Sequence, residues 1–163
     1  MKTNTARLEI KSWTIADAPV FFALSLDQGF TSFQITDYKQ TSVESAREWI
    51  QTHPEKYGVW LKTTTELIGM GGLTPWRWEG EELVDITYRL KSSAHGQGYG
   101  SELAQALVDY GFKTLGLTQI TATITPDNVA SKRIAQKLGM QFDRRIELLG
   151  VATDLYRLVK SAY

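Results

Sequence analysis

Apolar and polar residues alternate along several short stretches of the chain, which is typical of β-strands with one buried face. In residues 7–13, RLEIKSW, Leu8 and Ile10 alternate with charged residues. Similar alternating or continuous apolar runs predict further strands at 57–63, 67–76, 82–90 and 119–125, and two closing strands near MQFDRRIEL and TDLYRLV. The pattern therefore predicts about seven strands.

Helical periodicity separates these strands. Apolar residues fall on one side of 42–50, SVESAREWI, and Thr14 or Asp17 can cap a helix that contains DAPVFFALSL. A narrow polar stripe crosses an otherwise apolar surface in 99–115, which predicts a mostly buried helix, and DNVASKRIAQKL predicts another at 127–138. Strands joined through a helix can run parallel whereas hairpin strands cannot, so we expect a mixed sheet.

The composition limits the classes of function. The chain has 163 residues, enough for one domain, and its 18 Lys and Arg balance 18 Asp and Glu, so no overall positive charge attracts nucleic acid or anionic lipid. It contains no cysteine and only two histidines, which excludes disulfides and thiolate nucleophiles and leaves little support for a metal site. No signal-peptide pattern and no run of ~18 apolar residues is present. We therefore expect a cytoplasmic protein without nucleic-acid, membrane or metal partners.

Three glycines stand at the start of the predicted helix at 99–115, within SAHGQGYGSEL. The N–H groups of a first helical turn lack intrahelical acceptors, and together with the helix dipole they favour an anion such as pyrophosphate. Gly96, Gly98 and Gly100 allow a ligand to approach this backbone closely, but their G-x-G-x-G spacing does not match the dinucleotide fingerprint, and no P-loop motif occurs. A phosphate site and a tight strand-to-helix turn remain alternative interpretations of these residues alone.

Four segments together resemble the GNAT acyltransferase superfamily, and within it the branch of ribosomal-protein N-terminal acetyltransferases. They are the opening ARLEIKSWTIADAPVFFAL, the strand VDITYRL, the loop HGQGYGSEL and the later DNVASKRIAQKLGMQF, and they occur in the order expected for that family. The resemblance implies an α+β fold, a three-layer α/β/α sandwich around a mixed, mostly antiparallel sheet of about seven strands. It also implies that residues 1–163 form a single acyl-CoA N-acyltransferase domain.

The same resemblance implies that acetyl-CoA is the co-substrate. Backbone amides of residues 97–101 would hold its pyrophosphate, and the main chain of residues 88–90 would pair with the pantetheine arm. Asn128 would contact the pantetheine, and Ser131 would donate a proton to the leaving thiolate. The residues so assigned to coenzyme A are Tyr88, Arg89, Leu90, His95, Gly96, Gln97, Gly98, Tyr99, Gly100, Ser101, Asn128 and Ser131.

Two positions depart from the family pattern. His95 stands where many members have Arg or Gln, so one phosphate contact passes to a side chain whose charge depends on its surroundings. Ala135 stands where many members have a tyrosine acid, so Ser131 is the remaining candidate for that role.

The acceptor would be an amine, which must lose a proton during attack. Asp85 matches the acidic residue of the family's strand motif and is the predicted general base; a surface strand residue or an ion-pair partner of Arg89 is the alternative. Trp76 and Trp78, in the connection before EGEEL, would line the acceptor pocket, with packing or a dimer contact as the alternative.

We therefore predict an N-acetyltransferase in which a primary amine attacks acetyl-CoA directly in a ternary complex. The acceptor is a small-molecule amine or a protein amino terminus, and a homodimer is compatible with the expected exposed sheet edges. A non-catalytic acyl-CoA sensor on the same fold and a nucleotide-binding module are the alternatives.

Overall fold

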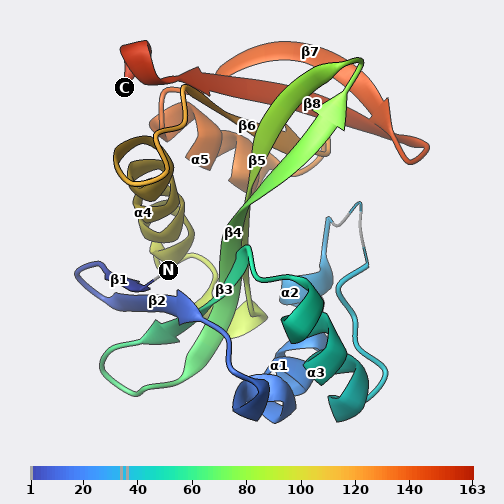
Figure 1. Cartoon of the computed structure of the whole chain (residues 1–163), viewed down its shortest axis with the longest axis vertical. Helices are drawn as coiled ribbons and strands as arrows, with labels where there is room; N and C mark the ends of the chain where they lie inside the picture. Colours follow the sequence, from blue (N-terminus) through green and yellow to red (C-terminus); the bar gives the residue numbers. More distant parts are fainter. Residues whose placement is uncertain (1, 34, 36) are drawn as a thin grey trace. The chain divides into compact units, whose positions relative to one another are not determined.

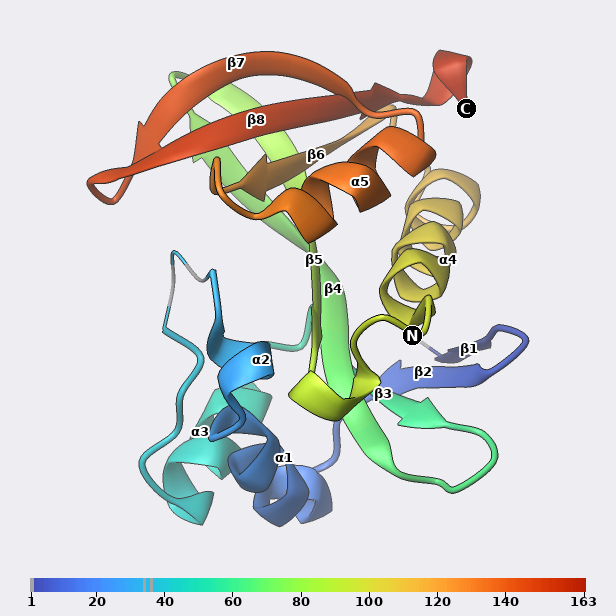
Figure 2. The ribbon, with the colours of Figure 1, turned by 180° about the vertical axis from the view of Figure 1, so that it is seen from behind.

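A computed structural model describes residues 2–33, 35 and 37–163 (Figures 1 and 2). The described strands form one eight-stranded sheet in the order β1-β2-β3-β4-β5-β6-β8-β7. They are β1 (Lys2–Asn4), β2 (Leu8–Ser12), β3 (Lys56–Leu61), β4 (Leu67–Trp78), β5 (Glu81–Leu90), β6 (Gln119–Ile124), β7 (Gln141–Leu148) and β8 (Val151–Val159). The pair β5–β6 is parallel, whereas β1–β2, β2–β3, β3–β4, β6–β8 and β7–β8 are antiparallel.

Helices join these strands into an α+β fold, as the sequence predicts. The α-helices of the described chain are α1 (Ala18–Ser25), α2 (Gln28–Thr31), α3 (Val43–Thr52), α4 (Tyr99–Lys113) and α5 (Val129–Lys137). Short 3₁₀ helices are η1 (Ile15–Asp17), η2 (Ser92–Ala94) and η3 (Lys160–Ala162). The seven predicted strands are all present, and β1 is the additional one.

The chain divides into two compact units. The first unit comprises Met1–Gly72 and Tyr88–Leu103, and the second comprises Leu73–Thr87 and Ala104–Tyr163. The predicted pyrophosphate loop and pantetheine strand therefore belong to the first unit, while Asp85, Asn128 and Ser131 belong to the second.

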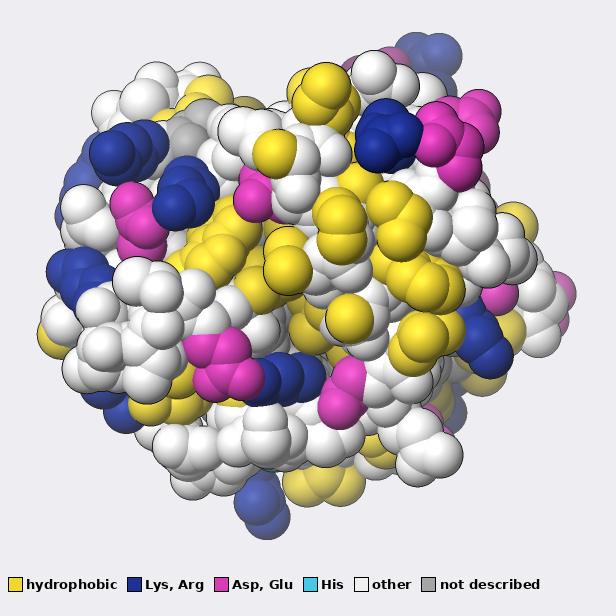
Figure 3. All heavy atoms as spheres, turned by 90° about the horizontal axis from the view of Figure 1, so that it is seen from below, with side chains coloured by type: hydrophobic (Ala, Val, Ile, Leu, Met, Phe, Trp, Pro, Cys, Tyr) yellow, Lys and Arg dark blue, Asp and Glu magenta, His cyan; other side chains and the backbone are white. Residues whose placement is uncertain are grey.

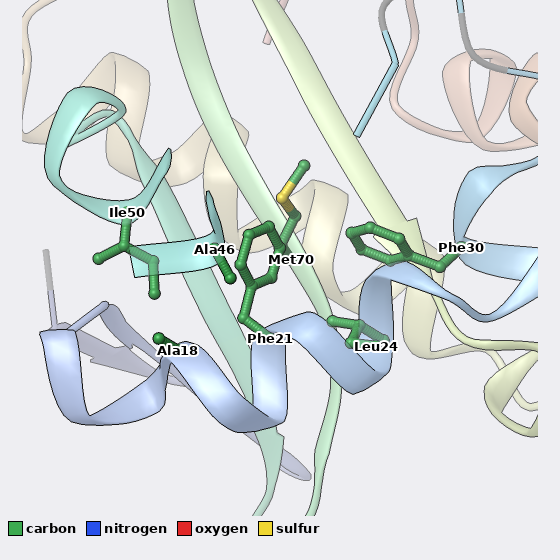
Figure 4. Close-up of a cluster of buried hydrophobic side chains, with 7 residues drawn as sticks. All are labelled: Ala18, Phe21, Leu24, Phe30, Ala46, Ile50 and Met70. Carbon is green, nitrogen blue, oxygen red and sulfur yellow. The ribbon is translucent and has the colours of Figure 1, made fainter. Parts of the chain in front are cut away.

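The core of the first unit joins α1 and α3 to β4 (Figure 4). Figure 4 shows the aromatic ring of Phe21 beside the side chain of Met70, and the ring centroids of Phe21 and Trp49 lie 4.7 Å apart. Ser42 caps the amino end of α3, and its hydroxyl accepts a hydrogen bond from Ser45 N at 3.1 Å. The buried cluster consists of Ala18, Phe21, Leu24, Phe30, Ala46, Ile50 and Met70.

The helix α1 has the sequence APVFFALS and is apolar nearly all round. Such a helix exposes apolar side chains wherever it is covered on one side only. Val20 of α1 and the flanking Ile15 and Leu26 are accordingly exposed. Figure 3 shows hydrophobic side chains gathered on the face of the protein that is seen from below.

In the second unit, α4 packs closely against β6. A Cβ atom at Gly111 of α4 would lie 2.8 Å from Ile120 Cδ1 and 3.0 Å from Leu73 Cδ1, so only glycine allows this approach. Side chains alternate across a strand, and Ile120 faces α4. Thr121 and Thr123 of β6 therefore do not share the face that Ile120 presents to the helix.

Asp27 anchors α2, and it should make folding stability depend on pH. Its Oδ1 accepts hydrogen bonds from Phe30 N at 3.1 Å, Ser92 N at 2.7 Å and Ser92 Oγ at 2.9 Å. Burial alone would raise the pKa of Asp27, but these hydrogen bonds lower it below its ordinary value. The ionised carboxylate therefore stabilises the fold above the unfolded-state pKa of about 3.9, and this contribution is lost as the pH falls through the folded-state pKa.

The Asp27→Ala variant should lose about 1–2 kcal/mol of unfolding free energy at neutral pH. The difference in unfolding free energy between this variant and the wild type should shrink at acidic pH, because the wild-type carboxylate is then protonated and its charge no longer contributes to stability. Urea unfolding of both proteins at a series of pH values measures this difference in unfolding free energy. A difference that stays constant down to the acid-unfolding range would show that the charge of Asp27 contributes nothing.

Candidate functional site

The glycine-rich loop enters α4 with a left-handed backbone at two positions. Gly96 has φ +74° and Gly98 has φ +82°, a region that other residues adopt only with strain. The N–H group of Glu102 donates to Gly98 O at 3.1 Å. The N–H groups of residues 99–101 precede this bond and have no acceptor within the helix. The loop and first turn therefore fit an anionic group such as pyrophosphate.

Arg7 lies against this loop from the segment before β2. Its Nη1 donates to Gln97 O at 2.9 Å, its Nε donates to Glu102 Oε2 at 2.7 Å, and its guanidinium carbon lies 4.4 Å from the ring centroid of Tyr99. Burial raises the pKa of Glu102, but hydrogen bonds from Thr5 and Arg7 outweigh it and lower the pKa below its ordinary value. A single arginine before a strand matches no sequence motif, so Arg7 could not be assigned to this site from the sequence.

His95 ties the loop to the end of β5. Its Nε2 lies 2.8 Å from Leu90 O, and since a carbonyl oxygen only accepts, Nε2 carries the proton. The imidazole is thus engaged with the main chain of the predicted pantetheine strand. His95 therefore helps to orient this strand, and its contact with a phosphate stays a prediction.

The side chain of Arg89 binds main-chain carbonyls in α2 and directly after it. It donates to Phe30 O at 3.0 Å and to Ser32 O at 2.8 Å, and its guanidinium carbon lies 4.8 Å from the ring centroid of Tyr38. Burial lowers the pKa of Arg89, and Tyr38 partly offsets this effect. Arg89 therefore stabilises α2 and the segment after it, through contacts that the sequence did not predict for its side chain.

Asp85 accepts hydrogen bonds from two threonines of the parallel neighbour β6. Thr121 Oγ1 donates to Asp85 Oδ1 at 2.9 Å, and Thr123 Oγ1 donates to Asp85 Oδ2 at 2.8 Å. The fully buried Thr121 also accepts a hydrogen bond from Trp76 Nε1 at 3.3 Å. The hydroxyl group of Thr121 thus connects the indole of Trp76 to the carboxylate of Asp85. Each oxygen of this carboxylate accepts a hydrogen bond from a threonine, and these two bonds orient it.

Trp76 and Trp78 both lie within β4, so the strand extends past its predicted end at residue 76 and takes in the start of the connection before EGEEL, which corrects the placement of Trp78. The strand extends to Trp78 because Glu79 and Gly80 have φ +46° and +86° and make a tight turn into β5. Alternate residues share one face of a strand, and the two indole rings lie 6.1 Å apart. The buried Nε1 of Trp78 has no hydrogen-bond partner among the described residues.

Arg157 of β8 lies beside Thr121 of β6. It is the cross-strand partner of Thr121, so both side chains lie on the same face of the sheet. Its Nη1 donates to Glu81 Oε1 at 2.6 Å, and its Nη2 donates to Asp143 Oδ2 at 3.0 Å. The Arg157 hydrogen bond, despite some opposing desolvation, lowers the pKa of Glu81 below its ordinary value. Arg157 therefore favours the ionised form of Glu81.

Asn128 and Ser131 meet at the start of α5. The side chain of Asn128 caps the helix, since its Oδ1 accepts a hydrogen bond from Ser131 N at 3.1 Å. This contact fixes the two predicted residues relative to each other. Ala135, one turn later, is fully buried, and Lys132 forms an ion pair of 2.7 Å with the buried Asp154.

Within residues 2–33, 35 and 37–163, no group of three or more acidic or histidine side chains is placed to hold a metal ion. The same part of the chain has no helix with the length and apolar character that a membrane span requires.

Comparisons with known proteins agree with the resemblance. The family described as "Acetyltransferase (GNAT) domain" matches residues 7–141. The chain is 35% identical over 156 residues to the uncharacterized protein YkkB of Bacillus subtilis (strain 168), covering 89% of this chain and 88% of that protein. It is 30% identical over 145 residues to the uncharacterized N-acetyltransferase YnaD of the same strain, covering 86% and 83%.

The fold is also similar to a solved structure of RimL, described as a ribosomal L7/L12 alpha-N-protein acetyltransferase in complex with coenzyme A. The TM-score is 0.81 at 21% identity, and the match covers 98% of this chain and 97% of that chain. This likeness concerns the fold alone.

Proposed function

The chain belongs to the GNAT acetyltransferase family, and we propose that it transfers an acetyl group from acetyl-CoA to a primary amine. The observation that carries the proposal is the glycine loop, because its left-handed Gly96 and Gly98 lead into the amino end of α4. A diphosphate is the part of acetyl-CoA that such a backbone binds best. The relative YnaD, named an N-acetyltransferase, supports an amine as the acceptor.

When bound, acetyl-CoA supplies a thioester whose carbonyl carbon an amine can attack. We assign the N–H groups of residues 97–101 to the pyrophosphate and the main chain of residues 88–90 to the pantetheine arm. Asp85 takes the proton that the amine loses as the C–N bond forms, and Ser131 donates a proton to the thiolate as the C–S bond breaks. Direct attack needs no nucleophile from the chain, which suits a sequence without cysteine.

Asp85 is supported as the base by its orientation. Its two oxygens accept hydrogen bonds from Thr121 and Thr123, so the carboxylate is held in one direction, as a general base requires. Trp76 donates to Thr121, and we propose that Trp76 and Trp78 form a wall of the acceptor site.

We propose that residues 1–163 act as one catalytic domain, since the family match at 7–141 includes residues of both units. We also propose that the protein works in the cytoplasm, where acetyl-CoA would be available to it. A homodimer stays a prediction, which size-exclusion chromatography with light scattering can test.

Isothermal titration calorimetry and an acetyl-transfer assay test the proposal together. Coenzyme A and acetyl-CoA should bind with dissociation constants below about 1 mM, and more tightly than ATP or NAD. A panel of peptide amino termini, polyamines, amino acids and aminoglycosides, assayed with labelled acetyl-CoA, should contain an acceptor. No binding of coenzyme A at millimolar concentration would overturn the proposal, and tight binding of ATP or NAD instead would indicate a nucleotide-binding module.

A further inference from the structure

We propose that Arg7 is a positioning residue, which holds the glycine loop so that its N–H groups face the pyrophosphate of acetyl-CoA. This inference rests on the proposed function. Arg7 contacts the loop at two places, through Gln97 O and through Glu102. The contact with Gln97 O affects the geometry of the pyrophosphate site, and the contact with Glu102 affects its charge.

The first effect concerns the peptide bond between Gln97 and Gly98. This bond is trans, so its C=O and N–H groups point in opposite directions. Arg7 Nη1 binds the carbonyl oxygen at 2.9 Å, and the N–H group of Gly98 therefore points away from Arg7. Without this contact the peptide plane can rotate, and the N–H group loses its fixed direction. Arg7 thus prepares a donor for the ligand without touching the ligand itself.

Arg7 also supports the left-handed conformation that the loop requires. The position that a Cβ atom would occupy at Gly98 lies 3.4 Å from Arg7 Nη2, so the guanidinium packs against this α-carbon. The ring of Tyr99 lies 4.4 Å from the guanidinium carbon. Arg7 is consequently in contact with Gln97, Gly98 and Tyr99, three successive residues of the predicted pyrophosphate site.

The second effect concerns the charge of Glu102. This carboxylate lies in the first turn of α4, where it would repel a bound pyrophosphate. Arg7 N donates to Glu102 Oε1 at 2.8 Å and Arg7 Nε donates to Oε2 at 2.7 Å, and the hydroxyl of Thr5 also binds Oε1. The side chain of Glu102 is only 17% exposed, so water screens its charge weakly in the folded protein. Arg7 therefore both holds the carboxylate in place and neutralises it.

The Arg7→Gln variant tests the proposal with two acetyl donors. Its KM for acetyl-CoA should rise about tenfold with kcat unchanged, the size expected when a charge-assisted hydrogen bond is lost. Its kcat/KM for S-acetylpantetheine, which has no pyrophosphate, should remain within about twofold of the wild type. The dissociation constant of coenzyme A, measured by calorimetry, should rise by the same factor as KM.

Arg47→Gln is the matched control. Arg47 is a partly exposed arginine of α3 in the same unit, and it forms an ion pair of 2.6 Å with Glu44. Its replacement removes an equivalent charge and hydrogen bond at a place away from the loop. The kinetic constants for acetyl-CoA and for S-acetylpantetheine should therefore equal those of the wild type. Arg7→Lys keeps the charge and should fold if Arg7→Gln does not; it should raise KM for acetyl-CoA by a smaller factor, because lysine cannot bind Gln97 and Glu102 with two separate nitrogens.

Three outcomes would overturn the role of Arg7. They are an unchanged KM for acetyl-CoA in both Arg7 variants, an equal loss of kcat/KM with both donors, and a loss confined to kcat. The proposed function fails separately, when the wild type itself neither binds coenzyme A nor transfers acetyl groups, and the role of Arg7 is then overturned with it.

Discussion

The Asp85→Asn variant is expected to lose about 10²-fold or more in kcat, while its dissociation constant for coenzyme A stays within about twofold of the wild type. The substitution keeps the size of the side chain and removes its negative charge, and with the charge its ability to take a proton. Thr121 and Thr123 can still form hydrogen bonds with the amide, because hydroxyl groups rotate to donate or accept. The loss should therefore appear in catalysis and not in folding.

Steady-state acetyl transfer and calorimetry measure the two quantities. Asp109→Asn is a matched control, because Asp109 is a carboxylate of the same unit that binds Lys113 on α4. It should keep the wild-type kcat. Full activity of Asp85→Asn would show that another group or water removes the proton, and a parallel loss of coenzyme A affinity would show that Asp85 supports the structure instead.

Elements with a regular hydrophobic pattern were predictable, because burial of one face selects the same residues along the whole element. The strand β2 and the helix α4 are examples, and both lie close to their predicted ranges. The strand β1 has the polar sequence KTN and exists through its pairing with β2, in which Lys2 faces Lys11. The short α2 depends on hydrogen bonds between Asp27 and Ser92, 65 positions apart. Such contacts leave no local pattern.

The candidate site likewise combines features with a local sequence pattern and contacts between residues far apart in the sequence. The left-handed loop before α4 was predictable, because glycines mark where the backbone must be left-handed and accessible. Arg7 acts on a residue 95 positions away, and Thr121 reaches Asp85 across 36 positions through strand register. A sequence without an alignment does not show which residues face each other across such distances. The supporting side chains therefore became visible only with the structure.

The Gly98→Ala variant is expected to weaken coenzyme A binding at least tenfold. Gly98 has φ +82°, and a left-handed conformation costs a residue with a Cβ atom about 1–2 kcal/mol. The loop can relieve this strain by turning the peptide groups on either side of residue 98, which redirects the N–H groups assigned to the pyrophosphate. Calorimetry with coenzyme A measures the affinity, and thermal unfolding measures the strain.

Gly116→Ala separates these two effects. Gly116 follows α4 in the second unit, has φ +68°, and a Cβ atom there would meet nothing within 4 Å. Both variants should therefore lower the unfolding temperature through the same backbone strain, whereas only Gly98→Ala should lose affinity for coenzyme A. Equal affinities in the two variants would mean that the direction of the N–H groups near residue 98 does not matter for binding, and the loop would then be a tight turn and not a pyrophosphate site.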